Sequence, residues 1–157
     1  MEIRLAVSAD EDAVCRLWSM LLEFYHKQAV PRVLQRSFRY AIGHPRKIRI
    51  FIISINGVVT GTASLQLGHY STWNNTWYGH IEDVIVDPAY RNRGLATALV
   101  KHAIKTAEEN NLSRVELNVL ANNHAARRIY ERLGLTTNSM AYELHFPHIP
   151  HAPKGSG

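Results

Sequence analysis

The chain lacks the features that mark disulfide-rich, metal-binding and membrane-spanning proteins. Its 157 residues include a single cysteine, Cys15, which excludes a disulfide framework within the chain and a cysteine-based metal site. No apolar run approaches the roughly 20 residues of a membrane-spanning helix, and the N-terminus does not have the organisation of a signal peptide. We therefore expect a cytoplasmic protein with no metal.

Two common phosphate-binding motifs are also missing, because neither Gly-x-x-x-x-Gly-Lys-Ser/Thr nor Gly-x-Gly-x-x-Gly occurs. Instead, residues 84–96 read VIVDPAYRNRGLA, which predicts a strand, a basic turn and a helix that opens at Gly94. The first turn of a helix presents unpaired backbone N–H groups and favours negative charge. Gly94 leaves room for a ligand beside the backbone, and Arg91 and Arg93 add positive charge. This segment therefore predicts a turn that binds a pyrophosphate.

The spacing Arg91-x-x-Gly94-x-Ala96 resembles the acyl-CoA-binding motif of the GNAT superfamily of N-acyltransferases, Arg/Gln-x-x-Gly-x-Gly/Ala. A second GNAT signature, Asn-x-x-Ala-x-x-x-Tyr-x-x-x-Gly-Phe, also has a counterpart later in the chain. It is matched by Asn123, Ala126, Tyr130 and Gly134, with Leu135 in the place of the aromatic residue. The resemblance covers about residues 48–144 and implies acetyl-CoA as the co-substrate.

Apolar periodicity and turn residues predict an α/β (α+β) chain with one domain over residues 1–146. Strands are expected at 2–7, 48–55, 58–67, 77–87, 114–120 and 136–146, and helices at 9–25, 31–43, 94–110 and 123–133. The resemblance implies the GNAT fold, a mixed central sheet of six to seven strands with helices on both faces. In that fold strands 77–87 and 114–120 are splayed. The Pro- and His-rich tail 147–157 is expected to be disordered, and its final Gly-Ser-Gly is compatible with a cloning remnant.

The resemblance implies that the pantetheine arm of acetyl-CoA lies in the gap between the splayed strands. Strand residues 84–86 would pair their backbone with this arm, and an N–H near Val84 or Ile85 would stabilise the thioester oxygen. The expected cofactor-binding residues are Val84, Ile85, Val86, Arg91, Asn92, Arg93, Gly94, Leu95, Ala96, Thr97, Asn123, Ala126 and Tyr130.

Two residues are expected to be catalytic. The resemblance implies that Tyr130 is the general acid that protonates the departing thiolate; from helical spacing alone it reads as a core aromatic residue. Glu82 is expected to bind the acceptor ammonium or to take its proton, because residues 79–84 resemble the strand near the acceptor in polyamine and glucosamine-6-phosphate acetyltransferases. A solvent-facing acid is the alternative for Glu82, and His80 or water is the alternative proton acceptor. Neighbouring carboxylates at Glu82 and Asp83 are expected on opposite faces of the strand.

Charge and resemblance leave several acceptors open. The net charge of +5 permits an anionic partner without requiring nucleic acid. The leading interpretation is acetyl transfer to the primary amine of a small molecule, such as glucosamine-6-phosphate, an aminoalkylphosphonate, a polyamine or an aminoglycoside. The alternatives are a macromolecular acceptor (a protein N-terminus, a lysine or an aminoacyl-tRNA) and a non-catalytic acyl-CoA sensor. Family proteins are often dimers, so we expect a homodimer.

Overall fold

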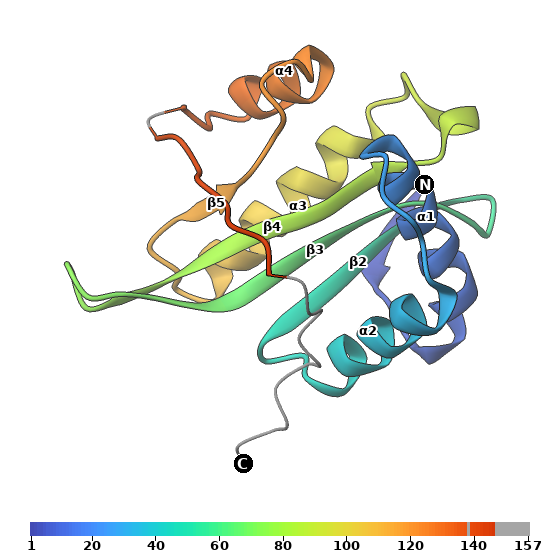
Figure 1. Ribbon diagram of the computed structural model, residues 1–157, viewed down its shortest axis with the longest axis horizontal. Coiled ribbons are helices and arrows are strands. Elements are labelled where there is room, and N and C mark those ends of the chain that lie inside the picture. The colour runs from blue at the N-terminus through green and yellow to red at the C-terminus, as the bar shows by residue number, and fades with distance from the viewer. Residues whose placement is uncertain (138, 147–157) are drawn as a thin grey trace.

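A mixed sheet of five strands lies at the centre of the computed structural model, which describes residues 1–137 and 139–146 (Figure 1). The strands are β1 (Glu2–Leu5), β2 (Ile48–Ile55), β3 (Val58–Ser71), β4 (Thr76–Val86) and β5 (Val115–Leu117). They lie in the sheet in chain order. All neighbouring pairs are antiparallel except β4 and β5, which are parallel.

Helices cover both faces of the sheet, as the fold class predicts. They are α1 (Glu11–Phe24), α2 (Pro31–Gly43), α3 (Leu95–Glu109) and α4 (His124–Arg132), with short 3-10 turns at Ser8–Asp10 and Pro88–Tyr90. Side chains of β2 alternate between the two layers, because successive residues of a strand point to opposite faces. Ile50 and Ile52 pack with α1 and α2, whereas Phe51 and Ile53 pack with α3. Burial on both faces explains why this strand reads as one apolar run.

Turn residues predicted the hairpin between β2 and β3 correctly. Asn56 and Gly57 have φ angles of 50° and 78°, the left-handed pair that a type I′ turn requires. The next hairpin is longer than expected. Residues 68–76 were predicted as a loop, but β3 and β4 pair as far as Ser71 and Thr76, because the aromatic rings of Tyr70 and Trp77 meet across the strands at 5.0 Å.

The C-terminal part of the sheet differs from the prediction. β5 is shorter than the expected strand 114–120, and the expected strand at 136–146 is not formed by the described residues 136, 137 and 139–146. A strand needs a hydrogen-bonded neighbour, and within one chain this segment has none among the described residues. The large side chains of the segment are 76% to 89% exposed; they are Met140, Tyr142, Leu144 and Phe146. The tail 147–157 lies outside the described residues.

Candidate active site

Strands β4 and β5 separate, as predicted for residues 77–87 and 114–120. Pairing between β4 and β5 ends at Ile81 and Leu117, whereas β4 continues to Val86 along β3 alone. The gap opens into a cavity of about 600 Å³, which we call the central cleft. Residues 84–86 line one side of it and Asn118 and Val119 line another. The edge of β4 beyond Ile81 is therefore not paired with β5 where it borders the cleft.

A β-bulge in β4 marks the point where the strands part. Thr62 pairs with Ile85 and Ser64 with Glu82, so one residue of β3 faces two of β4. Asp83 is one of the two, and its φ of 53° is left-handed, a conformation that costs free energy for a residue other than glycine. The bulge re-aims β4 and places two carboxyl groups next to the cleft.

The expected opposite orientation of Glu82 and Asp83 is wrong, because the bulge interrupts the alternation of the strand. Gln66 Nε2 donates a hydrogen bond to Glu82 Oε2 at 2.6 Å, and Ser64 Oγ donates one to Asp83 Oδ2 at 3.1 Å. Ser64 and Gln66 are two residues apart on β3, so they share a face of the sheet. Both carboxylates therefore meet the face of the sheet opposite α3.

The two carboxyl groups have different surroundings. The pKa of Asp83 is raised to about 6, mainly by burial and also by the negative charge of Glu82, while the hydrogen bond from Ser64 opposes both effects. The side chain of Glu82 is 41% exposed, and its Oε1 lies 3.6 Å from His80 Nε2. Glu82 does not line the central cleft; its carboxylate contacts the polar side chains of Gln66 and His80 instead. The resemblance to GNAT proteins implies a bulge in strand 77–87, but no residue pattern gives its position, so Asp83 was not among the expected catalytic residues.

The pyrophosphate turn has the backbone that the sequence predicts. Gly94 is the N-cap of α3 with a φ of 74°, and its carbonyl accepts a hydrogen bond from Ala98 N–H at 3.0 Å. A Cβ atom at Gly94 would meet no atom within 4 Å, so the space in front of this helix end is open. Arg91 Nε donates to the carbonyl of Val86 at 3.2 Å.

The carboxylate of Asp87 anchors this turn through two contacts. Its Oδ1 accepts the N–H of Ala89 at 3.0 Å, and its Oδ2 lies 2.7 Å from Arg16 Nη1 of α1. The hydrogen bonds from Arg16 and Ala89 lower the pKa of Asp87, so the carboxylate stays ionised at neutral pH. Asp87 therefore shapes the Asp-Pro turn.

Tyr130 reaches the cleft from α4. Asn123 caps this helix by accepting the N–H of Ala126 at 3.2 Å, and Gly134 ends it with a φ of 88°. Burial raises the pKa of Tyr130 to about 12, and the phenol of Tyr25 adds to the effect. A hydroxyl with this pKa is protonated at neutral pH, as a proton donor must be.

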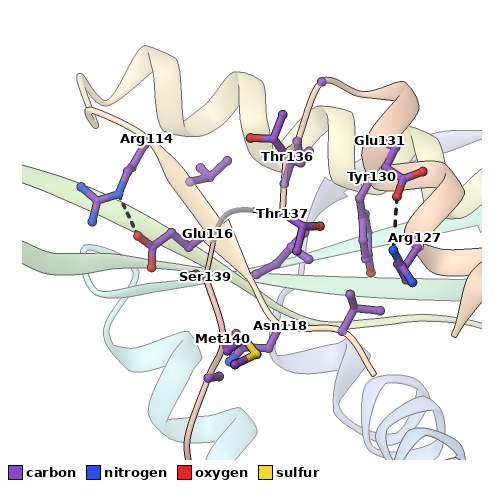
Figure 2. A pocket seen from close by; sticks show the side chains of 16 residues that line it. Arg114, Glu116, Asn118, Arg127, Tyr130, Glu131, Thr136, Thr137, Ser139 and Met140 are labelled. Atoms are coloured by element: carbon purple, nitrogen blue, oxygen red, sulfur yellow. Dashed lines mark hydrogen bonds and ion pairs between the residues drawn. The ribbon is translucent and has the colours of Figure 1, made fainter. Parts of the chain in front are cut away.

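Tyr130 also borders a second cavity. This cavity, of about 660 Å³, lies between β5, α4 and residues 134–137 and 139–141, and we call it the β5 groove. Figure 2 shows Tyr130 projecting from α4 toward the sheet, with the ion pairs Arg114–Glu116 and Arg127–Glu131 on either side. Tyr130 thus lines both cavities, together with Asn118 and Val119 of the chain after β5.

The central cleft gathers nearly all the residues expected to bind the cofactor. Twelve of them line it: Val84, Ile85, Val86, Arg91, Asn92, Gly94, Leu95, Ala96, Thr97, Asn123, Ala126 and Tyr130. Arg93 does not line it, because its guanidinium lies over the ring of Tyr90, 5.5 Å from the centroid. The cleft is also lined by the end of α1, through three residues that were not among the expected site residues: Leu21, Phe24 and Tyr25. Their apolar character is visible in the sequence, because α1 carries apolar residues to its last turn.

Comparison with known proteins decides the family. The model of the acetyltransferase (GNAT) family matches residues 12–135. The chain belongs to the GNAT family. Members of the GNAT family use acetyl-CoA, which agrees with the open helix end, the unpaired strand edge and the basic turn that line the central cleft.

Relatives within the GNAT family include enzymes that act on small amines. Glucosamine 6-phosphate N-acetyltransferase of Trypanosoma brucei brucei is 30% identical over 96 residues, which are 61% of this chain and 63% of that protein. Thialysine N-epsilon-acetyltransferase of Bos taurus is 31% identical over 86 residues, 53% of this chain and 51% of that protein. The chain therefore spans between 51% and 63% of the length of these two relatives.

The whole GNAT fold is matched by solved structures. A crystal structure of an acetyltransferase from Trypanosoma brucei has a TM-score of 0.74 and 26% sequence identity, with 92% of this chain and 99% of that chain covered.

Within residues 1–137 and 139–146, none of the helices is both long and apolar enough to cross a membrane. The same described residues contain no group of three or more His, Cys, Asp or Glu side chains placed to hold a metal ion.

Proposed function

We propose that this GNAT protein transfers an acetyl group from acetyl-CoA to a primary amine of a small molecule, by direct attack in a ternary complex. The observation that carries the proposal is the meeting of three features in one cleft. These are the unpaired edge of β4, the open N-terminus of α3 and the hydroxyl-bearing side chain of Tyr130. The proposal assigns residues 1–146 to one acetyltransferase domain, and a cytoplasmic location fits the single free cysteine, Cys15.

The cleft provides separate surfaces for the two ends of acetyl-CoA. The pyrophosphate would lie at the N-terminus of α3, where free N–H groups and Arg91 favour negative charge. The pantetheine arm would pair with the β4 edge at residues 84–86, as a peptide adds to a sheet. An N–H at Val84 or Ile85 would then face the thioester oxygen and stabilise the charge that develops on it.

The reaction needs one proton to leave the amine and another to reach the sulfur. The neutral amine nitrogen attacks the thioester carbonyl carbon, a C–N bond forms, and the C–S bond breaks with its electron pair left on sulfur. Tyr130 gives its hydroxyl proton to that sulfur. The phenolate that remains regains a proton from water before the next turnover. Support for this role comes from the position of Tyr130 in the cleft.

The amine proton is assigned to Glu82, directly or through water, with His80 as the second candidate. Glu82 is accessible to an acceptor because its side chain is 41% exposed, and it lies beside His80. Asp83 is a third candidate, since its pKa of about 6 leaves it largely ionised at neutral pH. Replacing Glu82→Gln and Asp83→Asn separately distinguishes them. We expect kcat/KM to fall about 100-fold in Glu82→Gln. If kcat/KM falls only in Asp83→Asn, Asp83 and not Glu82 accepts the amine proton.

Substitution of Tyr130 tests the proposed acid. Tyr130→Phe keeps the ring and removes the proton, so we expect kcat to fall by about 10²- to 10⁴-fold with the acetyl-CoA Kd within twofold of wild type. Tyr40→Phe, on α2 with its ring stacked on His44, is the matched control and should retain activity. Wild-type turnover in Tyr130→Phe would refute the acid assignment. Loss of acetyl-CoA binding would mean that Tyr130 serves the cofactor instead.

A macromolecular acceptor is the second candidate, favoured by the net charge of +5. Aminoacyl-tRNA would bind with a steep salt dependence, because each phosphate contact releases counterions. The names of the two relatives, which act on glucosamine 6-phosphate and thialysine, support the small-molecule acceptor instead. A pure acyl-CoA sensor would need neither an accessible Glu82 nor a protonated Tyr130, so turnover of any amine excludes it.

We also propose a homodimer, in which residues 139–146 of one copy add to the β5 edge of the other. Apolar side chains occupy every second position of this segment and are at least 76% exposed, which is the pattern of a strand without its sheet. β5 is the last strand of the sheet, and the β5 groove runs along it (Figure 2). A second copy supplies the same segment and the same edge, so the same contact forms twice about a two-fold axis.

Light scattering coupled to size-exclusion chromatography tests the dimer. The wild-type protein should elute with the mass of two chains at micromolar concentration, and Leu144→Asp should shift it to one chain. Trp73→Asp is the control, since Trp73 is 97% exposed but lies at the tip of the β3–β4 hairpin. A monomeric wild type, or a dimer that Trp73→Asp and not Leu144→Asp disrupts, would contradict the assignment.

A further inference from the structure

Two hydrogen bonds connect the outer part of the β3–β4 hairpin to Glu82. They are made by His69 and Gln66 of β3, which no step of the proposed reaction uses. His69 Nε2 lies 3.2 Å from Gln66 Oε1, and Gln66 Nε2 lies 2.6 Å from Glu82 Oε2. Both β3 residues are half-buried. The amide of Gln66 therefore joins an imidazole to the carboxylate that is assigned to the amine proton.

A second β-bulge, this time in β3, brings His69 to the face of the sheet that Gln66 occupies. Gln66 pairs with His80 of β4. His69 pairs with Tyr78, so β3 carries one more residue than β4 between the two pairs. Without the extra residue His69 would point to the opposite face, because side chains of a strand alternate. Instead its ring lies against those of Tyr78 and His80, with centroids 5.2 Å and 5.8 Å away.

The chemistry of the three groups fixes the direction of both hydrogen bonds. A carboxylate only accepts, so the NH2 end of the Gln66 amide faces Glu82 and donates to it. The amide oxygen at the other end also only accepts, so His69 donates to it from Nε2. His69 thereby holds Gln66 in the orientation in which its amide can donate to Glu82.

These contacts leave one oxygen of Glu82 for the acceptor. Oε2 accepts the hydrogen bond from Gln66, whereas Oε1 accepts none from residues 1–137 and 139–146 and lies 3.6 Å from His80 Nε2. A glutamate side chain that is 41% exposed can adopt several rotamers. A donor at Oε2 selects one of them before the amine arrives, so the carboxylate does not have to reorganise during the reaction.

We propose that Gln66 is a positioning residue for Glu82: its amide holds Oε2 and directs Oε1 to the acceptor amine, and His69 fixes the orientation of that amide. The inference rests on the proposed function of Glu82. Neither Gln66 nor His69 exchanges a proton with the substrate. The proton leaves the amine nitrogen, binds Glu82 Oε1 and passes to water.

Replacing the amide of Gln66 tests its role. Gln66→Met keeps the length of the side chain and removes the donor, so we expect kcat/KM for the amine to fall about tenfold, with the acetyl-CoA Kd within twofold of wild type. In the Glu82→Gln background the same change should have no further effect, because the carboxylate that it orients is absent. Gln35→Met, the same change on α2, is the matched control and should retain wild-type kcat/KM.

The pH profile of kcat/KM separates positioning from a structural effect. Loss of a hydrogen bond to a carboxylate disfavours its ionised form, so the acidic limb of the profile should move to higher pH in Gln66→Met and stay in place in the control. The substitution leaves intact the titratable and charged side chains described on this face around Glu82, which are His69, Tyr78, His80, Asp83 and Arg114, the last lying over the Tyr78 ring.

Two variants at His69 test the outer hydrogen bond. His69→Leu removes the donor, so we expect kcat/KM to fall about two- to tenfold, the value of a hydrogen bond between neutral groups. His69→Gln keeps an N–H donor and should stay within about twofold of wild type. This conservative rescue would not occur if His69 only filled space beside the Tyr78 ring.

The possible outcomes distinguish failure of the inference from failure of the proposed function. Equal losses from Gln66→Met in the wild-type and Glu82→Gln backgrounds would overturn the inference alone. An unchanged kcat/KM, an acidic limb that does not move, or equal activity of the two His69 variants would do the same. Full activity in Glu82→Gln, or turnover of no amine, would overturn the role of Glu82 and the inference together. If Gln66→Met lowers the unfolding midpoint, the His69 variants decide.

Discussion

At the scale of single residues, the site depends on backbone conformations that only certain side chains tolerate. Gly94 turns the chain into α3 with a φ of 74° and leaves open space in front of the helix end. Asp83 has a left-handed φ without being glycine, at the bulge beside the cleft. Strain of this kind is retained where the surrounding structure imposes it, and it is concentrated at functional sites. These two positions support two predictions.

Gly94→Ala should weaken acetyl-CoA binding more than it weakens the fold. The left-handed backbone costs an L-residue about 1–2 kcal/mol of unfolding free energy. The new methyl group meets no protein atom but extends into the space proposed for the pyrophosphate, so we expect the Kd to rise at least tenfold. Calorimetric titration and urea unfolding measure the two effects. Gly43→Ala, at the end of α2 and equally uncrowded, should leave the Kd unchanged; an unchanged Kd in Gly94→Ala would place the pyrophosphate elsewhere.

Asp83→Asn should stabilise the protein near neutral pH but not in acid. Folding raises the pKa of Asp83 from 3.8 to about 6, so the folded state binds the proton more tightly. The resulting stability is fully present below pH 3.8 and is lost as the pH rises to about 6, a difference of roughly 3 kcal/mol at most. Urea unfolding should show that the free energy of unfolding of the variant rises relative to that of the wild type between pH 4 and pH 7. Glu23→Gln, an exposed acid of α1, is the control, and parallel profiles for Asp83→Asn and wild type would contradict the buried carboxyl.

At the scale of elements, α1 and the turn before α3 are tied together. Arg16 on α1 pairs with Asp87 at 2.7 Å and donates to the carbonyl of Val59 at 3.3 Å. The tie joins the wall formed by the end of α1 to the pyrophosphate turn. Helix and turn therefore form one unit, although most of α1 packs against the other face of the sheet.

Arg16→Gln should loosen the pyrophosphate turn. The guanidinium is 43% exposed, so we expect the loss of unfolding free energy to stay within about 1 kcal/mol. Amide exchange of residues 87–94 should accelerate, and the acetyl-CoA Kd should rise a few-fold. Arg39→Gln is the matched control, because its ion pair with Glu11 joins α1 to α2 away from the turn. Equal exchange rates at 87–94 in the two variants would show that Arg16 does not hold the turn.

Elements with strong local signals were predictable from the sequence, and those that depend on distant partners were not. The helix start at Gly94, the N-cap at Asn123 and the hairpin at Asn56 depend on backbone chemistry within a few residues. The bulge at Asp83 depends on the register between β3 and β4, which no local pattern encodes. The segment 139–146 has the alternation of a strand but no neighbour within the described chain, so its pattern predicts a strand that one copy does not form.

At the scale of the whole molecule, the central cleft is assembled from parts of the chain that no single motif spans. The end of α1, the free edge of β4, the start of α3 and α4 all border it. The motifs predicted the last three, because phosphate and thioester chemistry demand particular residues there. The individual residues of the α1 wall could not be predicted, because its apolar residues resemble any buried helix face.

Release of free thiol from acetyl-CoA, measured across a panel of amines, tests the proposed function most directly. The panel contains glucosamine-6-phosphate, an aminoalkylphosphonate, a polyamine, an aminoglycoside, peptides and charged tRNA. We predict turnover on at least one small amine, lost in Tyr130→Phe while acetyl-CoA still binds. Turnover restricted to peptides or tRNA, or acetyl-CoA binding with no turnover on any amine, would contradict a small-molecule N-acetyltransferase.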